Sequence, residues 1–232
     1  MPEPPTPRRI DWGVLGVEAF AIFLSVLLGF GVTEWRDARA EAGRRADLLE
    51  AFAQEIAANR DGLVGKGSYH HWLVREVGAE AEAGRVRVLS DVFQIENVSG
   101  FNPLSLSGTA WQTATATGDI ALLDFDTASR LWQLYDAQRQ IDDEQDRMRA
   151  IALDQFNSRD PGQVTRFLTL MREFTSLERE LLFLTTEALQ GIADDRGLEP
   201  PPAIPADVFE RDPFAATSSG SPSPVAPPDD RE

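Results

Sequence analysis

The sequence predicts an all-α protein in which a single N-terminal transmembrane helix continues into a long-helix antiparallel bundle of about four helices, followed by a disordered Pro-rich C-terminal tail. Three observations support this fold class. An apolar stretch between Trp12 and Thr33 contains one charged residue. Only two of the 15 prolines, Pro103 and Pro161, fall in the central part of the chain, and proline breaks helix interiors. Nine of the others lie in residues 200–228, where little apolar content remains to offset the entropy of folding.

These observations divide the 232 residues into four parts. We expect a disordered N-terminal tail at 1–11, the transmembrane helix at 12–35, a helical bundle domain at 36–197 and a disordered tail at 198–232. A chain of this length is enough for one ordinary domain with such additions.

The first element is the apolar stretch from Trp12 to Trp35. On a helix these two residues lie roughly 35 Å apart, slightly more than the ~30 Å hydrocarbon core of a bilayer. That spacing is typical of tryptophans that anchor both ends of a span in the membrane interfaces. A secretory signal peptide has a shorter apolar region and a cleavage site after small residues, whereas this stretch ends in Glu34, Trp35, Arg36 and Asp37. We therefore expect an uncleaved, single-pass anchor in a lipid bilayer.

One face of this anchor is predicted to pack against another membrane helix. Ala21, Ser25 and Gly29 recur at every fourth position, and small residues at that spacing let two membrane helices approach closely. Glu18 borders the same face. Two interpretations of Glu18 stay open: a polar contact inside the helix–helix interface, since intramembrane carboxylates are often functional, or a carboxyl shallow enough to reach the interfacial region. The partner at this face would be a second copy of the chain or another member of a membrane complex.

After the anchor, apolar residues recur at helical spacing through most of the chain. The glycines between 62 and 67 are expected to break the first bundle helix and to start a second helical segment at 68–83. Between 85 and 103 the helical period is lost, and alternating Val, Phe and Ile residues indicate short extended pieces. Two long helical stretches flank the turn-like sequence at 158–162, so they should pack antiparallel. The second of them has the near-heptad spacing of a coiled coil.

Composition excludes several classes of function. The formal net charge of -16 opposes nucleic-acid binding, which needs a basic surface. The absence of cysteine excludes disulfides, zinc–thiolate sites and thiol catalysis. The two histidines, His70 and His71, are adjacent, so on a helix they point about 100° apart and do not form a shared metal site. The acidic run at 142–146 lacks the glycine and ligand spacing of a calcium loop. We therefore predict no catalytic, metal-binding or cofactor-binding residues and no cofactor.

Two segments carry a resemblance to a known family. One is the anchor together with "LLEAFAQEIAANRDGL" at 48–63, and the other is "SGTAWQTATATGDIALLDFDTASRLWQLYDAQ" at 107–138. They are similar to an uncharacterised family of single-pass bacterial membrane proteins with an N-terminal anchor and a helical extracytoplasmic domain. The resemblance implies no activity. It implies that Trp111, Thr117-Gly118 and Tyr135 are packing and turn markers, and that the helical domain lies outside the cytoplasm.

Together these features favour a membrane-anchored, non-enzymatic helical interaction or accessory module of the bacterial inner membrane, with its C-terminal domain in the periplasm. Arginines flank the anchor on both sides, so charge alone does not set the orientation. Two alternatives stay open: a membrane-tethered enzyme that uses carboxylates in the bundle, and a sensor-like ligand-binding domain. An enzyme needs a concave pocket with convergent acids whose pKa values are perturbed, so the chemistry of the pockets distinguishes these alternatives.

Overall fold

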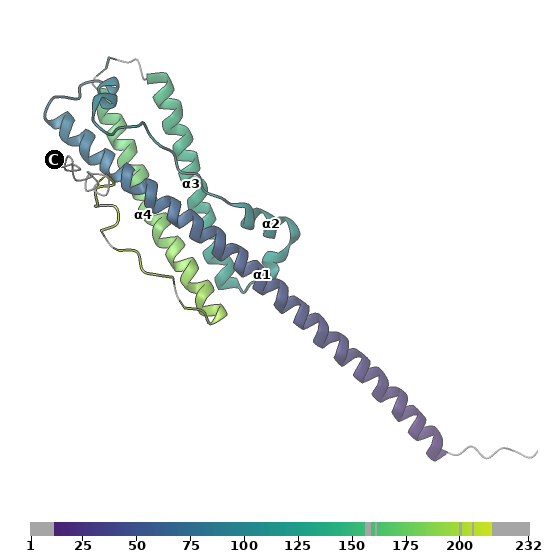
Figure 1. Ribbon diagram of the computed structural model, residues 1–232. Coiled ribbons are helices and arrows are strands. Elements are labelled where there is room, and N and C mark those ends of the chain that lie inside the picture. The colour runs from purple at the N-terminus through teal and green to yellow at the C-terminus, as the bar shows by residue number, and fades with distance from the viewer. Residues whose placement is uncertain (1–11, 156–158, 161, 200, 206, 215–232) are drawn as a thin grey trace, which may run out of the picture. The chain divides into compact units, whose positions relative to one another are not determined.

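A computed structural model describes residues 12–155, 159–160, 162–199, 201–205 and 207–214, without the side chains of 12–16, 18, 19 and 152–155. Within these ranges the chain is all-α and has no strand (Figure 1). The elements are α1 (Trp12–Glu82), the 3-10 helix η1 (Leu89–Gln94), α2 (Thr109–Thr117), the 3-10 helix η2 (Asp119–Leu122), α3 (Phe125–Gln155) and α4 (Gly162–Arg196). This confirms the predicted all-α class and the helical bundle.

Helix α1 runs without interruption for 71 residues, so the predicted break between residues 62 and 67 is wrong. Gly62 and Gly65 face open space, and a glycine in a helix interior costs only about 1 kcal/mol relative to alanine. Gly67 has a packing role instead. A Cβ at that position would lie 2.5 Å from Cε1 of Phe209, so the missing side chain lets the Phe209 ring lie directly against the helix.

The chain divides into two compact units, residues 1–47 and 48–232, and α1 contributes residues to both. In the first unit, eleven large apolar side chains between Val17 and Trp35 are 44–70% exposed. Among the described residues, no helix combines the length and the apolar character needed to cross a membrane. The transmembrane prediction for 12–35 therefore gains no support from the structure. The side chains of Trp12 and Glu18 lie outside the described set.

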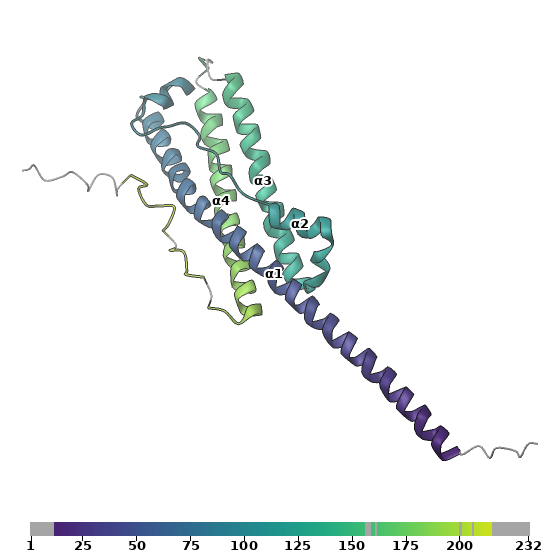
Figure 2. The same ribbon diagram turned by 45° about the vertical axis from the view of Figure 1, so that its right-hand side comes forward.

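In the second unit, residues 48–82 of α1 pack beside α3 and α4 (Figures 1 and 2). Helices α3 and α4 run in opposite directions, as predicted. The buried residues of all three helices repeat at every seventh position, the spacing of coiled-coil packing. The repeats are Leu49, Ile56, Leu63, His70 and Val77 in α1, Leu134, Ile141 and Met148 in α3, and Val164, Met171, Glu178, Thr185 and Ile192 in α4.

The connection between α1 and α3 contains no strand in its described residues. The extended pieces expected between 85 and 103 are wrong for Leu89–Gln94, although Val88 and Ile95, on either side of that segment, have extended backbones. Leu89–Gln94 form the 3-10 helix η1, because the Asp91 carboxylate accepts hydrogen bonds from the backbone N–H groups of Arg87 and Val88 and caps the turn. Gly118 ends α2 with a left-handed φ of 81°, a conformation that suits glycine.

Part of the predicted disordered tail lies against the helices. The C-terminal segment, residues 207–214, buries Phe209 to 4% exposure. The Arg75 guanidinium donates a hydrogen bond to the Phe209 carbonyl at 3.1 Å, and the Ser68 hydroxyl lies 3.2 Å from the Val208 carbonyl oxygen. The prediction for 198–232 is therefore wrong for this segment, because its few apolar side chains find partners on α1. Residues 215–232 lie outside the described set.

Candidate functional site

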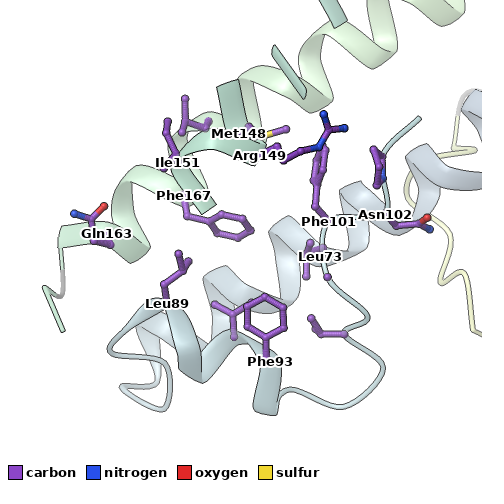
Figure 3. A pocket seen from close by; sticks show the side chains of 15 residues that line it. Leu73, Leu89, Phe93, Phe101, Asn102, Met148, Arg149, Ile151, Gln163 and Phe167 are labelled. Carbon is purple, nitrogen blue, oxygen red and sulfur yellow. The ribbon is translucent and has the colours of Figure 1, made fainter. Parts of the chain in front are cut away.

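The second unit contains an apolar cavity of about 500 Å³. Its walls come from α1, η1, the loop at 98–103, the end of α3 and the start of α4 (Figure 3). The lining residues are Leu73, Leu89, Val92, Phe93, Val98, Gly100, Phe101, Asn102, Pro103, Met148, Arg149, Ile151, Gln163, Phe167 and Leu170. The volume lies in the range of about 300–1,000 Å³ that small-molecule sites occupy.

Polar side chains are few in this cavity and lie apart from one another. Arg149 and Asn102 lie toward one end of the lining and Gln163 toward the other, with Phe167 and Leu73 between them (Figure 3). Arg149 is the one charged residue among those that line the cavity. Its Nη1 lies 2.6 Å from Oδ1 of Asp146, and both side chains are more than half exposed.

Side chains of α1 form hydrogen bonds with the backbone of the 98–103 loop. The Tyr69 hydroxyl donates a hydrogen bond to the Gly100 carbonyl at 2.6 Å and accepts one from the Ser99 N–H at 3.1 Å. The Lys66 ammonium group donates to the Pro103 carbonyl. Asn102 adopts a φ of 50°, a left-handed conformation that a residue other than glycine adopts at a cost. These contacts fix the loop in the position that makes it a wall of the cavity.

His70 is fully buried and supports the same loop. Its Nε2 lies 2.8 Å from the Phe101 carbonyl oxygen and 3.0 Å from that of Asn102. Because carbonyl oxygens only accept, Nε2 carries a hydrogen. Its Nδ1 lies 2.6 Å from Oε1 of Glu178, so one proton is shared between these two atoms. Burial raises the pKa of the Glu178 carboxyl, which favours the protonated, uncharged form of that carboxyl.

His71 faces the second oxygen of the same carboxyl. Its Nε2 lies 3.9 Å from Oε2 of Glu178, and neither atom has a hydrogen-bond partner. The Phe209 ring stacks on the imidazole at a centroid distance of 4.5 Å. Burial, followed by the charges of Arg179 and Arg75, lowers the pKa of His71 to about 4. The imidazole is therefore neutral at pH 7, and the Phe209 ring of the C-terminal segment covers it.

A second polar cluster holds the chain just after the loop. Asn59 pairs with the backbone of Ser107 through two hydrogen bonds of 2.7 and 2.8 Å. The Glu55 carboxylate accepts from the Ala110 N–H at the start of α2 and from the Tyr135 hydroxyl at 2.7 Å. A carboxylate at a helix N-terminus is favourable for the helix dipole. The cluster therefore fixes residues 107–110, which follow the loop that forms a wall of the cavity.

The site residues predicted from the sequence belong to the first unit, and none of them lines this cavity. Ala21, Ser25 and Gly29 are exposed on α1 in the first unit. The Ser25 hydroxyl donates to the Ala21 carbonyl at 2.7 Å within the helix. Trp35 is 64% exposed, with the Arg39 guanidinium 5.9 Å from its ring centroid. Whether the small-residue face packs against a partner stays a prediction.

Sequence reasoning missed the histidine–glutamate cluster, although a signal for it exists. His70 and Glu178 occupy heptad positions that are otherwise filled by apolar residues or threonine. A titratable residue at such a core position needs a partner, and two of them on different helices are candidates for one pair. His70 and His71 are adjacent, yet both face the Glu178 carboxyl, because its two oxygens point in different directions. In the described ranges, no group of three His, Asp or Glu side chains is placed to hold a metal ion.

Comparison with known proteins identifies no relative on which a function could be based. No family model, no curated protein and no solved structure matches the chain.

Proposed function

We propose that the chain is a membrane-anchored, non-enzymatic helical module in which residues 12–35 tether the bundle to a lipid bilayer. The observation that carries the proposal is the row of eleven exposed apolar side chains between Val17 and Trp35. An exposed apolar surface of this extent is typical of a membrane or protein interaction site. A helix that is apolar on all sides belongs in a protein core or a bilayer.

The sequence adds support at the end of the helix whose side chains are not described. Between Trp12 and Thr33, Glu18 is the one charged residue, and Trp12 and Trp35 stand at the spacing of the two membrane interfaces. We place the anchor in the bacterial inner membrane and the bundle on its periplasmic side, as the family resemblance implies. A second copy or another membrane helix would pack on the face of Ala21, Ser25 and Gly29. A Cβ added at Gly29 meets no atom within 4 Å, so this face is open to a partner.

The cavity favours a sensor-like, ligand-binding role for the bundle as the second candidate. Its apolar lining and its preformed wall are the features of a binding site rather than of a site for acid–base chemistry. An enzyme that uses carboxylates is less well supported. Glu178, the buried carboxyl with a raised pKa, has a side chain with 0% exposure and faces His70, so a substrate cannot reach it.

Alkaline extraction of membranes tests the anchor. We expect the full chain to stay in the membrane pellet after carbonate treatment, as integral proteins do. The double variant Leu24→Asp/Leu27→Asp should move to the supernatant, because charges at the centre of a span are costly. A matched control places the same charges on exposed apolar residues of the bundle, Phe125→Asp/Phe183→Asp, and should stay in the pellet. Release of the unmodified chain by carbonate would overturn the proposal.

A further inference from the structure

We propose that the apolar cavity binds a long-chain fatty carboxylate, with the alkyl chain among the side chains of Leu73, Leu89 and Phe167 and the carboxylate at Arg149. The inference rests on the ligand-binding candidate above and not on the membrane anchor. Its ligand is identified by three properties of the cavity: the size and lining of its interior, the charge at one end, and the rigidity of its wall.

The interior fits an unbranched alkyl chain. Most of its lining consists of Leu, Val, Phe, Met, Ile and Pro side chains, with few polar groups that a sugar, nucleotide or peptide would require. A methylene group takes up a volume close to the ~30 Å³ share of one water molecule in the liquid. A cavity of about 500 Å³ therefore matches about sixteen such groups, the size of a long alkyl chain.

The charge at one end selects the headgroup. Arg149 lines the cavity together with the uncharged Asn102 and Gln163. A guanidinium presents five N–H donors in a planar fork that matches a carboxylate. The contact of Arg149 with Asp146 involves two exposed side chains, and such surface pairs are worth little. The remaining donors of Arg149 are available to an anionic headgroup while the chain occupies the apolar interior.

The wall shows that the cavity is a built feature of the fold. The loop carries Asn102 in a left-handed conformation and is fixed by Tyr69 and His70. His70 in turn depends on a fully buried carboxyl, Glu178. Buried polar groups are costly unless each is paired, and a connecting loop could be held by simple apolar packing. A wall that is fixed in advance lets a ligand bind without the cost of ordering the loop.

Photo-crosslinking tests the proposal in the full chain. The protein, in bilayer nanodiscs or in detergent-free buffer if carbonate releases it from membranes, is exposed to hexadecanoate that carries a diazirine in mid-chain. It is then irradiated, and the crosslinks are mapped by peptide mass spectrometry. We expect crosslinks on peptides that contain Leu73, Phe93 or Phe167, and loss of these crosslinks with excess unlabelled hexadecanoate. Crosslinks confined to residues 12–35 would mean that the probe is merely dissolved in the bilayer, and would overturn the proposal.

A cavity-filling variant and a matched control separate binding from folding. Leu170→Trp fills the cavity and should lower crosslinking at the bundle at least tenfold. Leu177→Trp adds the same ring one heptad further along α4, at a partly buried residue outside the lining, and should leave crosslinking unchanged. Circular dichroism of both variants checks the fold. Unchanged labelling in a folded Leu170→Trp variant would refute the site.

The headgroup is tested by competition between hexadecanoate and hexadecanol. The unmodified chain should prefer the carboxylate, and Arg149→Gln should lower that preference about three- to fivefold, as expected for a partly exposed ion pair of up to ~1 kcal/mol. Arg147→Gln removes a neighbouring arginine that pairs with Glu144 and does not line the cavity, so it should keep the preference. Equal competition by the alcohol in the unmodified chain would refute the carboxylate assignment. If carbonate releases the chain from membranes but the cavity residues are still crosslinked, the anchor is refuted and this inference is unaffected.

Discussion

Acid is expected to destabilise the bundle through His71, and replacing this histidine should remove much of the effect. The folded chain holds the pKa of His71 at about 4, against an ordinary value of 6.5, chiefly because the ring is buried beneath Phe209. As pH falls below 6.5, the unfolded chain binds a proton at this position and the folded chain does not, so the unfolded state is favoured. The effect is fully present once the pH reaches about 4. A shift of this size corresponds to about 3 kcal/mol, at about 1.36 kcal/mol per pH unit.

Urea denaturation of the full chain in mild detergent, followed by circular dichroism between pH 7 and pH 4, measures this effect. The variant His71→Phe keeps a ring against Phe209 and does not titrate, and His71→Gln serves as a second non-titrating variant should the phenylalanine pack poorly. For both, the loss of unfolding free energy from pH 7 to pH 4 should be about 3 kcal/mol smaller than for the unmodified chain. Parallel pH profiles for the unmodified chain and both variants would refute the buried, neutral state of His71.

Three further predictions concern Gly67, Glu178 and Gly29. Gly67→Ala should displace Phe209, lower the unfolding free energy by about 1–3 kcal/mol through overpacking and speed proteolysis at 207–214. Gly65→Ala faces open space and should leave proteolysis unchanged. Equal proteolysis of the two variants would contradict the packing role of Gly67. Glu178→Leu should lower the unfolding free energy, measured by urea denaturation, by about 1–3 kcal/mol, because Nδ1 of His70 loses its partner. Glu178→Gln can still donate to that nitrogen and should lower the unfolding free energy less. A larger loss for Glu178→Gln than for Glu178→Leu would contradict the shared proton. Gly29→Ile should weaken self-association in bilayers, measured by energy transfer between labelled copies. Gly31→Ile lies about 200° away around the helix and should leave the energy transfer unchanged. Unchanged energy transfer in both variants would argue against packing through the face of Ala21, Ser25 and Gly29.

The helical bundle could be predicted from the sequence because its signals are local. Few prolines and apolar residues at heptad spacing predict long helices, and a short polar connection between two of them predicts antiparallel packing. The same local reasoning misplaced a helix break at the glycines near Gly67, because the partner that makes Gly67 useful is Phe209, far along the chain. It also assigned Phe209 to a disordered tail, because the composition around it is dominated by proline.

The cavity could not be predicted in the same way, because its wall depends on long-range contacts. Asparagine tolerates the left-handed conformation of Asn102 better than most residues do, but the contact of its carbonyl group with His70 joins positions 32 residues apart. The pair of His70 and Glu178 was within reach, since both residues interrupt apolar heptads. Recognising it requires the two helices to be placed side by side in the correct register, which the sequence pattern alone does not provide.

The proposed anchor can be tested most directly by labelling single cysteines, because the chain has none of its own. Leu24→Cys and Gly43→Cys are compared on intact spheroplasts and on opened membranes with a membrane-impermeant maleimide. We predict that Leu24→Cys resists labelling in both preparations and reacts only after detergent is added, because it lies in the hydrocarbon region. Gly43→Cys should react on intact spheroplasts, as expected for a bundle on the periplasmic side. Labelling of Leu24→Cys at the same rate as Gly43→Cys in sealed membranes would contradict the anchor.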